Sequence, residues 1–178
     1  SGFAFIFTLL VFNSCKSNDS LSQTPDSSIN TDLKTLRFTV EEATDWSGLF
    51  LRSSGWIGGD GIFAIPNNGV DTAGAGQNQE TVLLFSDTIF GDIINDSIQP
   101  GFKMVHNSVA IIKGNEPVKN AIQFYVNKKD NGDPESMFIP STPNSQPGAY
   151  YWRGNAFVNQ AMADATYIVA DWVKESRR

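Results

Sequence analysis

The sequence holds one cysteine and one histidine, and these two scarcities exclude several kinds of site at the outset. With only Cys15 among 178 residues, neither an internal disulfide nor a cysteine metal site is possible. With only His106, a multi-histidine metal centre is excluded as well. The chain also lacks a nucleophile elbow, a P-loop and a dinucleotide-binding fingerprint. The chemistry that remains rests mainly on carboxylates.

Basic residues are also scarce. The chain has 13 Lys and Arg against 19 Asp and Glu, which gives a formal net charge of −6 and a pI near 4.6. No basic cluster exceeds the pairs 128–129 and 177–178, so the composition argues against a nucleic-acid partner. By contrast, 40% of the residues are hydrophobic and 12% are aromatic, which is enough to bury the core of one domain or slightly more.

Only one long hydrophobic run is present, near the N-terminus. Residues 3–12 are mostly apolar, too few to span a bilayer but typical of the hydrophobic region of a signal peptide. The run ends in 12-FNSC-15, which resembles a bacterial lipoprotein signal, in which the cysteine is lipidated after cleavage. Phe12 stands where Leu is commoner. The alternative is that Cys15 is a core cysteine in an amphipathic helix.

We therefore expect three parts: a signal peptide at 1–15, a flexible tether at 16–34 and a folded domain at 35–178. The tether is rich in Ser, Asn and Asp and nearly free of apolar residues, a composition typical of linkers. A lipidated Cys15 implies a membrane-anchored lipoprotein, in the periplasm or on the surface of a bacterium. The chain opens without Met and stops within a strand-like pattern, so we expect a piece of a longer protein.

The folded part is expected to be all-β. Short runs rich in β-branched and aromatic residues are bounded by Gly, Asn, Asp or Pro, a pattern typical of strands. A leading segment at 36–43 precedes four successive strands at 61–66, 81–88, 107–113 and 121–127. One short helix is expected within 38–50, with Thr39 and Glu42 as a capping box. The four strands form a meander, which fits a propeller blade, a sandwich or a barrel.

A faint internal repeat favours the propeller. Segment 56-WIGGDGIFAI-65 is echoed by 152-WRGNAFVN-159, and 82-VLLFSDT-88 is echoed by 166-TYIVADW-172. Asp87 recurs as Asp171, whereas Asn155 stands about where Asp60 would. A long repeat that contains a strand meander is typical of successive propeller blades.

Three polar groups are expected to meet at one end of the meander. In antiparallel strands the start of the first, the end of the second and the start of the third lie together. These positions are Asp60, Asp87 and the run His-Asn-Ser at 106–108. Glycines 58, 59 and 61 around Asp60 allow close backbone approach and positive φ. The alternative is that both acids only cap turns by accepting bonds from backbone amides.

These residues together resemble a known family. WIGGDG, then a hydrophobic strand running into SDT, then HNS before another strand are similar to the first blade of five-bladed β-propellers related to glycoside hydrolases. The closest likeness is to bacterial families that include endo-D-arabinanases, over 56–126 and, more weakly, 150–171. The resemblance implies a five-bladed propeller, represented here by its first one to two blades. It also implies that Asp60 matches a general base and Asp87 a second acid, while the acid catalyst comes from a later blade.

The functional prediction is a lipoprotein that hydrolyses glycosidic bonds in an arabinan-like or related polysaccharide, a reaction that commonly uses two carboxylates. Asp60 and Asp87 are the candidate catalytic residues, and His106, Asn107 and Trp152 the candidate substrate-binding residues. No cofactor is expected, although the acidic stretch 128–135 leaves a structural calcium ion conceivable. The alternatives are a non-catalytic carbohydrate-binding propeller lipoprotein and a propeller that scaffolds protein partners.

Overall fold

A computed structural model describes residues 39–72, 75, 78–162 and 165–174. The expected signal peptide (1–15) and tether (16–34) lie outside the described residues. The chain divides into two compact units, Ser1–Ala43 and Thr44–Arg178, and the described part of the first, Thr39–Ala43, is exposed and irregular. The expected helix is present but begins later, because α1 spans only Thr44–Gly48. The capping box predicted at positions 39 and 42 was therefore wrong, since both residues precede the helix.

Four antiparallel strands form the main sheet, in the order β2-β3-β7-β8. They are β2 (Phe63–Pro66), β3 (Glu80–Phe85), β7 (Ser108–Lys113) and β8 (Ile122–Tyr125). These are the four predicted strands, and they pair side by side in the predicted order. The alternation of β-branched and aromatic residues was therefore a sound guide to this sheet.

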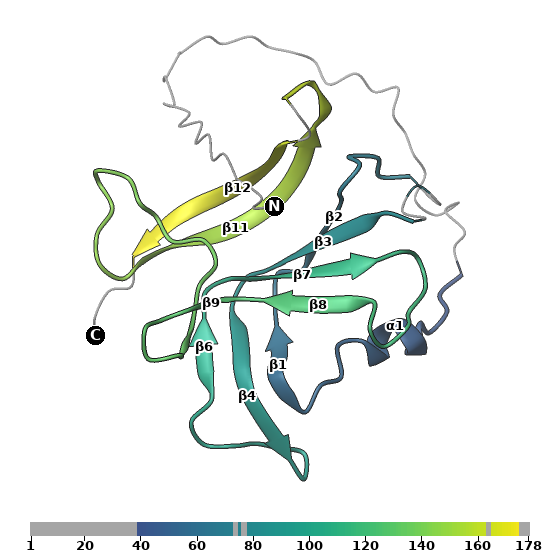
Figure 1. The fold of residues 1–178 in the computed structure, drawn as a ribbon, viewed down its shortest axis with the longest axis horizontal. Helices are drawn as coiled ribbons and strands as arrows, with labels where there is room; N and C mark the ends of the chain where they lie inside the picture. The colour runs from purple at the N-terminus through teal and green to yellow at the C-terminus, as the bar shows by residue number, and fades with distance from the viewer. Residues whose placement is uncertain (1–38, 73–74, 76–77, 163–164, 175–178) are drawn as a thin grey trace, which may run out of the picture. The chain divides into compact units, whose positions relative to one another are not determined.

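A second sheet contains strands that the sequence analysis missed. β1 (Ser54–Gly59) pairs with β4 (Thr88–Ile94), and β4 also pairs with β6 (Lys103–Val105) and β5 (Ser97–Ile98). The chain runs from β1 into β2, from β3 into β4 and from β6 into β7. Three segments thus cross from one sheet to the other, and Figure 1 shows them bending where they cross. The crossings lie at residues 60–62, 86–87 and 106–107.

Two hairpins follow β8. β9 (Asn127–Lys128) pairs with β10 (Pro134–Glu135). β11 (Ala149–Asn159) pairs with β12 (Ala165–Lys174), and the 3-10 helix η2 (Gln160–Met162) follows β11. The β9–β10 hairpin is the stretch considered for calcium. Within it, Asp133 lies 3.4 Å from the Lys103 ammonium, and the described residues contain no cluster of three or more His, Cys, Asp or Glu able to hold a metal ion.

Hydrophobic side chains cover both faces of the main sheet, as alternation along its strands requires. On one face, Leu83 and Phe85 pack in a cluster with Trp56 of β1. On the other, Leu84 and Val109 pack in a cluster with side chains of the β11–β12 hairpin, namely Ala156, Val158 and Ile168. The hairpin thus forms a layer against one face of the sheet. The chain is mainly β with several antiparallel sheets, as expected, and no described helix is long and apolar enough to cross a membrane.

Candidate functional site

The two acids of the sequence analysis meet where the sheets cross. The Asp60 amide donates to the Asp87 carbonyl oxygen at 3.0 Å, and the Ser86 amide donates to the Asp60 carbonyl oxygen at 2.9 Å. One residue therefore faces two on the neighbouring segment, which is the pattern of a β-bulge. Bulges bend a strand and re-aim its side chains, and they are frequent next to active sites. We call this place the bend, defined by residues 60–62, 86–87 and 106–107.

Two glycines make the close approach at the bend possible. Gly61 has φ +55°, and a Cβ there would lie 2.6 Å from Ser86 Oγ. A Cβ on Gly59 would lie 3.1 Å from the Phe85 ring and 3.2 Å from the Trp56 ring. Any larger side chain would therefore push the two segments apart. Gly58, by contrast, borders open space, so the same argument does not apply to it.

The carboxylate of Asp60 does not cap a turn within the described residues, so it is available to contact a ligand. Asp60 is exposed, and among the hydrogen bonds of the described residues none involves its carboxylate. Its backbone alone ties it to the neighbouring segment. Asp87 differs, because its Oδ1 lies 3.4 Å from His106 Nδ1, with the Asp87 side chain 45% exposed and the His106 side chain 28% exposed. One carboxylate at the bend is thus unengaged within the described residues and the other is paired.

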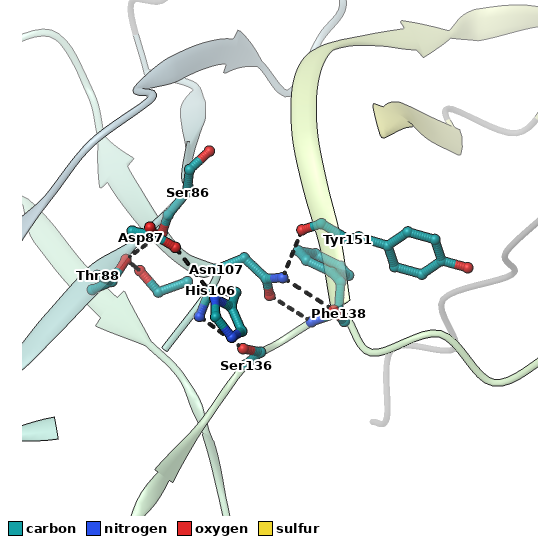
Figure 2. A network of polar contacts seen from close by, with 9 residues as sticks. Ser86, Asp87, Thr88, His106, Asn107, Ser136, Phe138 and Tyr151 are labelled. Atoms are coloured by element: carbon teal, nitrogen blue, oxygen red, sulfur yellow. Dashed lines mark hydrogen bonds and ion pairs between the residues drawn. The ribbon is translucent and has the colours of Figure 1, made fainter. Parts of the chain in front are cut away.

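His106 is held on several sides. Its backbone amide donates to Ser136 Oγ at 3.0 Å, as Figure 2 shows. Its ring stacks on the ring of Tyr150 in β11, with the centroids 3.6 Å apart and the planes 12° from parallel. His106 therefore connects the bend to β11. Local sequence patterns do not predict this stacking, because Tyr150 lies in a distant segment of the chain.

Asn107 lies inside the protein and joins three segments. Its side chain is fully buried, and its amide nitrogen donates to the carbonyl oxygens of Phe138 (3.0 Å) and Tyr151 (3.2 Å). Its carbonyl oxygen accepts a bond from the Phe138 amide at 2.8 Å, and Figure 2 shows all three bonds. Through these bonds Asn107 holds its own segment to those of Phe138 and Tyr151, which is a structural role. Its expected contact with substrate stays a prediction.

Arg153, a buried arginine next to the bend, is a residue that the sequence analysis did not single out. Arg153 of β11 is 3% exposed, donates from Nη2 to the Ser108 carbonyl oxygen at 3.0 Å, and lies 5.0 Å from the Phe138 ring centre. Nε and Nη1 have no partner among the described residues. Burial lowers the pKa of Arg153 to about 10. Ser108 Oγ in turn bonds Thr88 Oγ1 at 2.9 Å.

The remaining predicted residues lie elsewhere. Trp152 is 53% exposed and faces Asp171 across the β11–β12 pair, and no described contact joins its ring to the bend. Its expected role in substrate binding stays a prediction. Cys15 falls outside the described residues. The β11–β12 register shifts between Arg153 and Ala156, so the position that echoes Asp60, Asn155, also lies at a bulge.

Comparison with protein families gives one match. Residues 43–176, most of the chain, fit a family described as a domain of unknown function, DUF5005. The chain belongs to this family. A comparison with curated proteins found no match. The family description specifies no activity.

A solved structure shares the fold of this DUF5005 chain. It is the crystal structure of a "putative hydrolase" from Bacteroides ovatus, with a TM-score of 0.54 and 18% sequence identity. The match covers 75% of this chain and 34% of the other, so this chain corresponds to about a third of that protein's length. At such low identity the likeness concerns the fold alone.

Proposed function

We propose that this DUF5005 chain carries part of the active site of a glycoside hydrolase that acts on an arabinan-like or related polysaccharide. The observation that carries the proposal is the bend, where one main-chain hydrogen bond joins Asp60 to Asp87 and a second joins Asp60 to Ser86. Residues opposed in this way have Cα atoms about 5 Å apart. In the proposed reaction both acids act on one glycosidic bond, as the two acids of such enzymes do.

The two acids have different surroundings, which suits different roles. In the proposed reaction Asp60, whose carboxylate is exposed, acts as the general base that activates a water molecule. Asp87, paired with His106, contributes a second negative charge to the site. The acid catalyst is supplied by a part of the protein beyond this chain. The B. ovatus structure, titled a "putative hydrolase", is larger than this chain, which is compatible with such a division.

The proposed architecture is a β-propeller. Its first blade contains the main sheet, and the β11–β12 hairpin begins the second. The packing of Ala156, Val158 and Ile168 against the face of the main sheet supports this assignment, because neighbouring blades pack face to face.

We also propose that the protein is a bacterial lipoprotein, anchored through Cys15 in the periplasm or at the cell surface. The support is the sequence alone: an apolar run ending in FNSC and the polar stretch after it. An anchored enzyme of this kind would meet polysaccharide outside the cytoplasm. Its partners would be the glycan and the membrane.

The test is Asp60→Asn in the full-length protein, assayed on arabinan-type polysaccharide. Asn keeps the size and the backbone bonds of Asp60, so folding should survive. Turnover should fall about a hundredfold or more, the lower end of the usual general acid–base contribution, while sugar binding persists. Asp92→Asn is the matched control, since Asp92 is an exposed acid in β4 away from the bend. Unchanged turnover in folded Asp60→Asn would refute the catalytic role.

A non-catalytic carbohydrate-binding protein is the second candidate. It is favoured by Trp152, whose ring is half exposed and can stack on a sugar. This candidate predicts that the wild-type protein binds the glycan without cleaving it. Trp152→Ala would then weaken binding, and Asp60→Asn would have no effect on it.

A further inference from the structure

His106 and Tyr150 form a single rigid unit at the bend. Their rings are stacked at 3.6 Å, and the backbone on both sides of the histidine ring is fixed. The His106 amide bonds Ser136 Oγ, and Ser136 is itself buried. Asn107, the next residue, is fully buried and bonded to Phe138 and Tyr151. The imidazole therefore has little freedom to rotate or shift.

The fixed imidazole is aimed at Asp87. His106 Nδ1 lies 3.4 Å from Asp87 Oδ1, a distance somewhat long for a hydrogen bond, and such contacts often tighten only when substrate binds. The Asp87 side chain is 45% exposed. Among the interactions of the described residues, the contact with His106 is the one that limits the rotation of this side chain. A half-exposed carboxylate that must face a reacting bond requires a second residue to orient it.

We propose that His106 is a positioning residue for Asp87, and that Tyr150 positions His106 in turn. This proposal rests on the proposed hydrolase function. It replaces direct sugar binding by His106 with a chain of contacts from β11 through the imidazole to the carboxylate. Through His106, Tyr150 then connects the layer formed by β11 and β12 to Asp87. The contribution of Asp87 to the proposed reaction consequently depends on the correct packing of this layer.

The geometry of the unit can be tested without any activity assay. A proton above the face of an aromatic ring resonates upfield, so the ring protons of His106 should be shifted upfield by Tyr150. In the full-length protein, labelled at histidine, the His106→Gln variant identifies the His106 signal. Tyr150→Phe should leave the signal in place because Phe stacks equally well, whereas Tyr150→Leu should move it downfield. An unmoved signal in Tyr150→Leu would overturn the proposed stacking.

The positioning role is tested by kinetics on the same variants. Loss of orientation lowers kcat, and a misplacement of about 1 Å costs on the order of a hundredfold, so Tyr150→Leu should lower kcat between about tenfold and a hundredfold. KM should change little, and Tyr150→Phe should restore kcat. Tyr151→Leu is the control, since the same change one residue further along β11 removes a ring that does not stack on His106.

One result would contradict the positioning role and another the proposed function, and the two can be told apart. If Tyr150→Leu raises KM and leaves kcat unchanged, His106 and Tyr150 bind sugar directly and the positioning role is wrong. If the wild-type protein cleaves no glycan, the proposed function itself fails. In that case the histidine resonance still decides whether the stacked unit exists.

Discussion

At the scale of single residues, the least expected feature is the burial of Arg153. Taking a guanidinium out of water disfavours its charged form, and the pKa of Arg153 is accordingly lowered to about 10. One hydrogen bond to Ser108 and the Phe138 ring offset part of this penalty. Sequence reasoning treats arginine as a surface residue. The alternation of side chains in β11 does indicate this burial, because it places Arg153 on the same side of the strand as buried Ala149.

This burial leads to a prediction about stability and pH. The lowering of the Arg153 pKa to about 10 corresponds to roughly 3 kcal/mol, at about 1.36 kcal/mol per unit. Arg153→Met keeps much of the length without the charge, so it should stabilise the folded state at pH 7 by about 2 kcal/mol after loss of about 1 kcal/mol for the hydrogen bond. Urea unfolding of both proteins measures the difference.

The sign of the pH dependence follows from linkage. Above about pH 10 the folded wild type releases the Arg153 proton before the unfolded chain does, so wild-type stability rises from about pH 10 up to the ordinary pKa of arginine. The advantage of Arg153→Met should therefore shrink over this range. Arg52→Met is the control, because Arg52 is exposed above the Phe124 ring. A loss of several kcal/mol in Arg153→Met would instead reveal an anionic partner for the guanidinium.

At the scale of elements, the junction at Asn107 decides how β7, the 136–138 segment and β11 stay together. Three hydrogen bonds converge on this one side chain. Because the Asn107 side chain is fully buried, water cannot replace these bonds when the side chain is removed. The backbone groups left behind would be buried without partners.

Asn107→Ala should therefore destabilise the protein by about 3 kcal/mol, at roughly 1 kcal/mol for each bond. Asn127→Ala is a matched control, since its amide also donates to two backbone carbonyls, those of Ser136 and Met137, but Asn127 is exposed. That control should lose about 1 kcal/mol or less. Denaturant unfolding checks both values. Normal stability combined with weakened glycan binding would return Asn107 to the substrate-binding role.

The elements also show how far sequence reasoning reached. Alternating apolar residues marked β2, β3, β7 and β8 correctly, and antiparallel geometry brought Asp60, Asp87 and His106 to one place. β1, β4 and β6 were missed because the strands were expected to end where the chain only bends. A bulge leaves no periodic signature, since one extra residue shifts the alternation on one strand alone. Contacts such as Tyr150 on His106 depend on long-range packing, which local patterns do not encode.

At the scale of the whole molecule, the proposed lipoprotein anchor concerns the place in the cell where the protein works. The proposed lipoprotein signal predicts that Cys15 is the first residue of the mature protein and carries lipid. Expressed from its own gene in a bacterial host, the wild-type protein should fractionate with membranes, and Cys15→Ser should remain uncleaved and unlipidated. Mass spectrometry of the N-terminal peptide distinguishes the two forms. Ser14→Ala is the control, because a small residue before the cysteine should be processed normally. A lipid-free mature wild type would exclude the lipoprotein.

The bend also constrains how such a site can change during evolution. Many enzymes acquire new substrates by exchanging the loops that carry their functional residues. Here Asp60, Asp87 and His106 lie between strands that are paired on both sides of the crossing. An inserted or deleted residue would slip the register of an entire sheet and turn its hydrophobic side chains outward. Changes in specificity should therefore accumulate in the segments that surround the bend, while the spacing of the three residues stays the same.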